Sequence, residues 1–180
     1  MAKKFAVILA GNGVYDGSEV YETTYTLYAI MQQGGEYQMF APDISQHHVV
    51  NHITGEEMDE TRNVLIESAR IARGEIKALS EFRAEDFDAL AIPGGFGVAK
   101  NLSTYAIEGS NMHVNPEVEQ AIKSIADAGK PIVATCISPV VLAKVLGDVE
   151  MTIGQDEQTA KDIETMGSRH TNTGHGEVVV

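Results

Sequence analysis

The chain has 180 residues, of which 43% are hydrophobic and 22% are charged, as expected for a single globular domain that buries its own core. The formal net charge of −13 argues against nucleic acid or an anionic membrane surface as a partner, because both require basic patches. A single cysteine excludes an internal disulfide and is typical of a reducing compartment, so we expect a cytoplasmic protein.

Apolar strands alternate with helical segments along the chain. The run FAVILA is typical of a strand buried on both faces, and it is too short to span a membrane. Ser18 is a plausible N-cap for the first helix, and Gly34 marks its end. The predicted strands cover 5–10, 36–42, 75–79 (at a sheet edge), 88–95 (stopped by Pro93 and two glycines), 131–136 and 149–153, and the predicted helices cover 18–32, 59–73, 116–128, 138–146 and 155–166.

This alternation predicts an α/β fold with a mostly parallel central sheet and helices on both faces. In such sheets, ligands bind outside the carboxyl ends of the strands. Four turns leave those ends: GNGVYDG (11–17), the histidine-containing segment 43–58, PGGFG (93–97) and TCISP (135–139). We therefore expect the first, third and fourth turns to meet at one edge, although the sequence does not give the strand order.

Cys136 lies where a predicted strand meets a predicted helix. The backbone N–H groups and the helix dipole at such a junction favour a thiolate, and the turn exposes the sulfur as in other nucleophile elbows. The alternative is a buried cysteine that only packs in the core. The two glycines of PGGFG allow close backbone approach, so Gly95 N–H and Ile137 N–H could form an oxyanion hole, or PGGFG could be a plain tight turn.

Glu19 and Glu22 are three residues apart at the start of the first helix, on one face. Acidic residues there often only complement the helix dipole. If one of them points at Cys136, the two acidic groups would share a proton, with the carboxylic acid donating to the thiolate.

Two weaker patterns compete with the cysteine site. GNGVYDG is one residue longer than the dinucleotide fingerprint, and Asp43 could then bind a ribose. His47, His48 and His52 match no established metal-ligand spacing, so we predict no metal site. His113, His170 and His175 have no predicted role.

Several longer blocks resemble a known family. The ATC-Ile-Ser-Pro elbow, PGGFG and the glutamate after the first glycine-rich turn resemble the PfpI-type, class I glutamine amidotransferase-like superfamily. AGNGVYDGSEVYE, FAPD, VNHITGEEMDETRNVLIESARIARGEI, PGGFGVAKNL and TIGQD resemble the ElbB-like glyoxalases, once named isoprenoid-biosynthesis proteins with an amidotransferase-like domain. The similarity extends over essentially the whole chain.

The resemblance implies a flavodoxin-like three-layer sandwich, with residues 1–180 forming one amidotransferase-like domain that lacks its C-terminal strand and helix. It implies that Cys136 is the nucleophile and Glu22 its acidic partner, with Gly95 and Ile137 in the oxyanion hole. Glu19, Gly94 and Ser138 would support them. It also implies conversion of glyoxal or similar small dicarbonyls to glycolate without a cofactor, and a homodimer.

Superfamily members that use a downstream histidine carry it in the turn after the elbow helix, where this chain has TIGQD and no histidine. Amide cleavage needs a general acid for its amine leaving group, whereas addition of a thiol to an aldehyde does not. The sequence therefore favours the glyoxalase reaction over amide hydrolysis. The alternative is a non-enzymatic redox sensor or stress-related protein in which Cys136 is oxidised.

Overall fold

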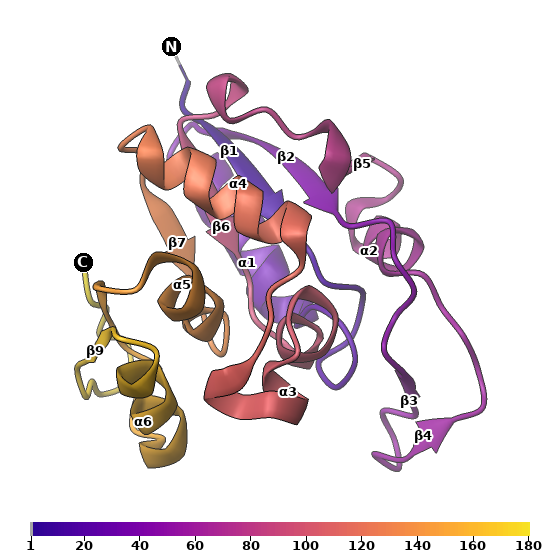
Figure 1. Ribbon diagram of the computed structural model, residues 1–180. Coiled ribbons are helices and arrows are strands. Elements are labelled where there is room, and N and C mark those ends of the chain that lie inside the picture. Colours follow the sequence, from indigo (N-terminus) through magenta and orange to yellow (C-terminus); the bar gives the residue numbers. More distant parts are fainter. Residues whose placement is uncertain (1) are drawn as a thin grey trace.

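The computed structural model describes residues 2–180 and contains a parallel five-stranded sheet between two layers of helices (Figure 1). The strand order is β5-β2-β1-β6-β7. The bounds of these strands are β1 Lys4–Ile8, β2 Glu36–Ala41, β5 Ile76–Ala78, β6 Ala89–Ile92 and β7 Ile132–Ala134. The predicted edge strand is thus confirmed as β5, and the α/β, flavodoxin-like three-layer arrangement is confirmed as well.

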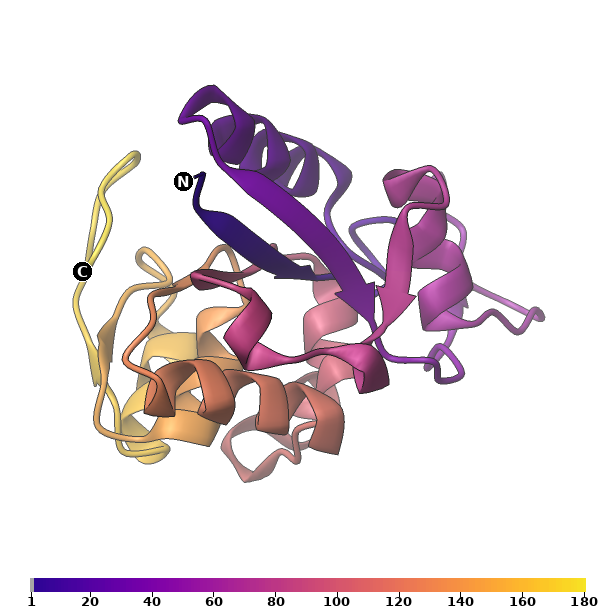
Figure 2. The ribbon, with the colours of Figure 1, turned by 90° about the horizontal axis from the view of Figure 1, so that it is seen from above.

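Side-chain alternation along the strands assigns the helices to the two faces of the sheet. Val7 and Leu9 face the layer of α1 and α2, while Ala6 and Ile8 face α4, α5 and α6. Figure 2, seen from above, shows the sheet between these layers. The helix bounds are α1 Val20–Gln32, α2 Val64–Ala72, α4 Pro116–Asp127, α5 Pro139–Leu146 and α6 Glu157–Thr165.

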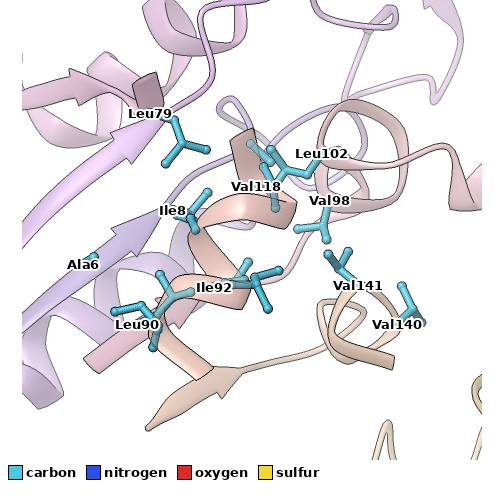
Figure 3. Close-up of a cluster of buried hydrophobic side chains, with 14 of the residues drawn as sticks. Ala6, Ile8, Leu79, Leu90, Ile92, Val98, Leu102, Val118, Val140 and Val141 are labelled. Atoms are coloured by element: carbon cyan, nitrogen blue, oxygen red, sulfur yellow. The ribbon is translucent and has the colours of Figure 1, made fainter. Parts of the chain in front are cut away.

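The larger core cluster holds the elbow region against the sheet. Figure 3 shows Ile8 of β1 and Ile92 of β6 close to Val118 of α4 and Val141 of α5, all of them buried. Each such side chain contributes about 1.5–3 kcal/mol by leaving water. Strand β6, which leads into PGGFG, and helix α5, which follows the elbow, are thereby fixed relative to β1.

Two predicted helix starts are wrong. Glu19, not Ser18, is the N-cap of α1, and its side chain accepts a hydrogen bond from Glu22 N–H. The buried Ser18 hydroxyl instead accepts from Ala10 N–H at 2.8 Å, because the glycine-rich turn folds back over the end of β1. Helix α2 begins at Val64 rather than at residue 59, because Asn63 caps it through Ile66 N–H.

The polar segment 43–58 contains a short antiparallel hairpin, which extends to the lower right of Figure 1. Its strands are β3 Val49–Val50 and β4 Glu57–Met58. Asn101 attaches the segment to the sheet edge: its Oδ1 accepts from His47 N–H, and its Nδ2 donates to Ala10 O and Asp16 O. Asp16 Oδ2 also accepts from Val50 N–H at 2.7 Å.

The predicted strand over 149–153 is present only as β8, which lies outside the main sheet and pairs in parallel with β9. Several short elements were not predicted from the sequence. These are β9 Arg169–His170, a π-helical turn η3 Val98–Leu102, a short helix α3 Tyr105–Glu108, and the 3-10 turns η1 Leu79–Glu81, η2 Ala84–Asp86 and η4 Gly109–Asn111, whereas the predicted strand is β8 Glu150–Met151. Residues 177–180 form no helix or strand.

Candidate active site

Three of the predicted turns meet at the carboxyl ends of β1, β6 and β7. Phe96 N–H donates to Val14 O at 2.8 Å, and Gly97 N–H donates to Gly17 O at 2.9 Å. Glu19 N–H donates to Gly94 O at 2.9 Å, which attaches the start of α1 to the end of β6. The expectation that these turns share one edge is confirmed.

Cys136 forms the turn between β7 and α5 and is exposed, so it is not a core thiol. Its φ of 55° is in the left-handed region, which a residue with a side chain rarely adopts. Ser138 secures this conformation: its N–H donates to Thr135 O at 2.9 Å, and its buried hydroxyl donates to Pro93 O at 3.0 Å. The predicted supporting residue Ser138 therefore holds the elbow against β6.

The carboxyl group of Glu22 lies beside Cys136. Its Oε2 accepts hydrogen bonds of 2.9 Å from both Gly94 N–H and the Thr135 hydroxyl, and its side chain contacts the sulfur. A Cβ at Gly94 would lie 2.3 Å from Cys136 Cβ and 2.7 Å from Glu22 Oε2. Only glycine fits between the two reactive side chains.

Glu19 is close in sequence but plays a different part. Its carboxylate is engaged by Glu22 N–H, so it caps α1 and fixes the first turn that carries Glu22. Of the two candidate acids, the structure brings Glu22 against the sulfur and leaves Glu19 in a supporting position.

The pKa of the Cys136 thiol is raised, contrary to the low pKa expected at a strand–helix junction. Although the residue as a whole is exposed, neighbouring atoms partly cover its sulfur, and this burial is the largest cause; the charge and hydrogen bonding of Glu22 add to it. Backbone N–H groups of Gly95 and Ile137 contact the sulfur and act in the opposite direction. The resting pair is thus a thiol beside a carboxylate, with two N–H groups directed at the reacting atom.

A cavity of about 350 Å³ opens beside the sulfur. It is lined by Val14, Gly95, Phe96, Cys136, Ile137, Ile153, Asp156 and Thr159. The last two belong to the start of α6, where Asp156 is the N-cap and accepts from Thr159 N–H at 2.8 Å. The sequence indicated a helix here, but not that it would pack near the elbow.

The stretch TIGQD has no histidine of its own, but His170 of β9 reaches it. His170 Nε2 accepts a hydrogen bond of 3.2 Å from Ile153 N–H. This histidine had no predicted role because only the β8–β9 pairing brings it here. It is absent from the residues that line the cavity.

The competing sites predicted from the sequence are filled by the protein's own side chains. A Cβ at Gly13 would lie 2.6 Å from His52 Nε2, so the imidazole occupies the glycine-rich turn where a pyrophosphate would sit. Asp43 accepts from the Asn63 amide at 2.7 Å rather than facing a ligand site. Among residues 2–180, no group of three or more metal-binding side chains is present.

Comparison with known proteins agrees with this geometry. Residues 4–152 match the DJ-1/PfpI family. The chain is 46% identical to human "Glutamine amidotransferase-like class 1 domain-containing protein 3, mitochondrial" and 34% identical to zebrafish "ES1 protein, mitochondrial". These alignments cover 94% and 92% of this chain and 67% of each relative.

A solved structure is also closely similar. The isoprenoid biosynthesis protein with amidotransferase-like domain from Ehrlichia chaffeensis superposes with a TM-score of 0.87 and 40% identity, covering 94% of this chain and 79% of that one. The resemblance inferred from the sequence blocks is confirmed at this level. No helix within residues 2–180 has the length and apolarity needed to cross a membrane.

Proposed function

Because the chain belongs to the DJ-1/PfpI family, we propose that Cys136 and Glu22 form a cofactor-independent glyoxalase centre that converts glyoxal and similar small dicarbonyls to glycolate and its analogues. The observation that carries the proposal is the position of Glu22 beside Cys136: a Cβ built on Gly94 would lie 2.7 Å from Glu22 Oε2 and 3.0 Å from Cys136 Sγ, and Gly95 and Ile137 line the same cavity as Cys136. This arrangement supplies a nucleophile, a base and an anion site without a metal or a cofactor.

In the first step the Glu22 carboxylate takes the thiol proton as sulfur adds to one aldehyde carbon. A raised thiol pKa makes the proton acceptor necessary, because few thiolates exist at neutral pH. The new oxyanion is stabilised by Gly95 N–H and Ile137 N–H, which already face the sulfur. Glu22 then gives this proton to the oxyanion, which yields the neutral hemithioacetal and restores the carboxylate.

In the second step one proton moves between the two carbons. A carboxylate takes the proton from the hemithioacetal carbon to give an enediol, and the acid then returns a proton to the neighbouring carbon. This leaves a thioester of glycolic acid, and water hydrolyses it to glycolate and the free thiol. No electrons enter or leave, because one carbon is oxidised as the other is reduced.

The position of Glu22 makes it the group for both proton transfers. Its Oε2 is held at 2.9 Å from two donors, Gly94 N–H at the end of β6 and the Thr135 hydroxyl in the elbow, so it stays beside the sulfur throughout. Amide hydrolysis would require a general acid beside the leaving nitrogen. Within the described residues that line the cavity there is no histidine.

Glycolate formation from glyoxal tests the proposal, with Cys136→Ser, Glu22→Gln and Glu19→Gln compared with the unmodified protein. We expect Cys136→Ser to abolish turnover and Glu22→Gln to lower kcat by roughly 100-fold or more, as for other general bases. Glu19→Gln keeps an acceptor for Glu22 N–H and should retain most activity. Equal rates in all four proteins would disprove the glyoxalase.

A redox-sensing role is the second candidate. The observation that favours it is the exposed thiol beside Glu22, because a carboxyl group can hydrogen-bond a sulfinic acid. Peroxide titration followed by mass spectrometry would detect it. Stoichiometric oxidation of Cys136 together with no aldehyde turnover would establish the sensor in place of the enzyme.

Two further expectations concern the whole protein. We propose a cytoplasmic location from the single free thiol, whereas the names of the human and zebrafish relatives place those proteins in mitochondria. Cell fractionation decides between these two reducing compartments.

The homodimer implied by the resemblance stays a prediction, and sedimentation equilibrium would test it by measuring the mass of the protein in solution.

A further inference from the structure

The cavity beside Cys136 is larger than glyoxal requires. Its volume is about 350 Å³. Since a water molecule takes about 30 Å³ of liquid volume, a dialdehyde with only four non-hydrogen atoms would fill roughly a third of it. A substrate bound covalently at the sulfur therefore leaves most of the cavity for a substituent.

The walls around that space are apolar. Val14, Phe96, Ile137 and Ile153 contribute to the lining, and Phe96 remains 47% exposed. Phe96 N–H is bonded to Val14 O, and the Lys100 ammonium lies 5.3 Å from the centroid of the Phe96 ring. A ligand whose hydrocarbon group covers this aromatic face beside the nucleophile would gain the most binding free energy.

The charges around the cavity disfavour an anionic substituent. Thr159 holds the pKa of the Asp156 carboxyl below its ordinary value through hydrogen bonds from its N–H and hydroxyl. Asp156 is therefore ionised at neutral pH, and the Glu22 carboxyl lies beside the sulfur. Among the described residues that line the cavity, none is Lys or Arg. A carboxylate or phosphate in the cavity would meet like charge, since Lys100, whose ammonium lies at the Phe96 ring, donates to Tyr15 O and is not among the lining residues.

We propose that this cavity is a specificity subsite for uncharged apolar groups, so that the preferred substrates are 2-oxoaldehydes R–CO–CHO in which R is an alkyl or aryl group of about four to seven carbons. This rests on the proposed function for the turnover of such compounds. The aldehyde carbon bonds to Cys136, and R lies against Phe96 and Ile153.

The chemistry balances as it does for glyoxal. The thiol adds to the aldehyde carbon, the hydrogen on that carbon leaves as a proton, and a proton returns to the ketone carbon. Hydrolysis of the thioester gives R–CH(OH)–COO⁻ and restores the thiol. The product is a chiral 2-hydroxy acid, and its new carboxylate is repelled by Glu22 and Asp156, which favours release.

Simple aldehydes test the subsite without relying on turnover. Hexanal and acetaldehyde both form hemithioacetals but lack the second carbonyl group, so the reaction stops there. We would measure how each aldehyde protects Cys136 from iodoacetamide, with glutathione as the reference thiol for intrinsic reactivity. Burial of each methylene strengthens binding roughly fourfold. Hexanal should therefore give the same protection of Cys136 at a concentration at least about 30-fold lower than acetaldehyde. The carboxylate analogue 5-oxopentanoate should protect no better than acetaldehyde.

Variants locate the effect in the cavity. Phe96→Ala and Ile153→Ala should each reduce the hexanal preference by roughly fivefold to tenfold, because each removes several apolar carbons. Ile107→Ala is the matched control, since Ile107 is exposed on α3 and is not among the cavity residues. It should leave the preference unchanged.

Turnover of 2-oxoheptanal and glyoxal completes the experiment and separates the two proposals. A kcat/KM at least about 30-fold higher for 2-oxoheptanal, with one enantiomer of the hydroxy acid formed, supports both. Glyoxal turnover without any chain-length preference in either assay overturns the subsite alone. Hexanal protection as expected but no turnover of either dicarbonyl overturns the glyoxalase and leaves the subsite standing.

Discussion

At the scale of single residues, the backbone conformation of Cys136 determines where its sulfur points. A φ of 55° costs about 1–3 kcal/mol for a residue with a side chain, and the hydrogen bonds of Ser138 offset that cost. In return, the sulfur faces the Glu22 carboxyl and the N–H groups of Gly95 and Ile137. Replacing the thiol with another group would keep the turn but lose the reacting atom.

The pH dependence of Cys136 alkylation follows from its environment. Burial and the neighbouring carboxylate raise its pKa, so the thiolate fraction rises only at higher pH than for an ordinary thiol. We expect the rate of reaction with iodoacetamide to increase with pH and to reach its midpoint above that of a free cysteine. Glu22→Gln should move this midpoint downward, because it removes a negative charge beside the sulfur.

The matched control for this experiment is Glu19→Gln, which changes the same residue type one helical turn away and keeps the cap of α1. Its midpoint should stay close to that of the unmodified protein. A midpoint below that of free cysteine, or one that Glu22→Gln fails to move, would contradict the described thiol–carboxylate pair.

At the scale of elements, one side chain of the π-helical turn η3 helps to hold the hairpin segment 43–58 in place. The Asn101 amide donates to Ala10 O and Asp16 O, and its carbonyl oxygen accepts from His47 N–H. Asn101→Asp has the same shape but places a carboxylate oxygen against two carbonyl oxygens. We expect a loss of roughly 2–4 kcal/mol in the free energy of unfolding, because buried acceptors lose their donor.

Hydrogen exchange measures where this loss acts. Exchange should accelerate in residues 46–52 and in the glycine-rich turn that carries Val14, while β6 and β7 remain protected. Asn51→Asp is the control, since Asn51 uses only its side-chain oxygen, which accepts from Ile53 N–H. Unchanged exchange in Asn101→Asp would show that the segment is held by other contacts.

The elements with a strong period were predictable from the sequence, and the short ones were not. In FAVILA and in the helix that contains Val118, Ile122 and Ile125, the spacing of the apolar residues predicts which side chains are buried. The π-helical turn η3 and the two-residue strand β9 have too few residues to show a period, and the pairing of the predicted strand β8 with β9 outside the main sheet has no sequence signal. Their positions depend on partners far along the chain.

The same limit applies to the candidate site. Strand ends alone indicated that PGGFG and the elbow lie at one edge, since both follow apolar strands. The choice of Glu22 as the partner of Cys136 came from the family resemblance, because 113 residues separate Thr135 from its hydrogen-bond partner Glu22. The contribution of Asp156 and Thr159 to the cavity could not be predicted, because it requires the packing of α6.

At the scale of the whole molecule, acidic groups outnumber basic ones by 26 to 13, so the folded chain repels itself. Most of its ion pairs are exposed and contribute little. Salt should therefore screen more repulsion than attraction. We expect Tm at pH 7.5 to rise by a few degrees between about 10 mM and 300 mM sodium chloride, where the Debye length falls from about 30 Å to below 10 Å.

Circular dichroism at 222 nm follows this transition, and glucose at equal osmolality controls for non-ionic effects. A Tm that falls with salt would mean that the attractive pairs dominate. Duplex DNA should not bind at any of these salt concentrations, because the net charge has the same sign as the phosphates.

Beneath the active site, the backbone of PGGFG packs directly against the backbone of the glycine-rich turn after β1. A Cβ at Gly95 would lie 2.4 Å from Gly17 O, and one at Gly97 would lie 2.5 Å from Ala10 O. No side chain can be introduced at these two positions without moving the backbone, whereas Phe96 and Ile153, which line the cavity, can change in size. Selection for new substrates, in nature or in a library, would then change mainly these cavity-lining side chains, while the reaction itself stays the same.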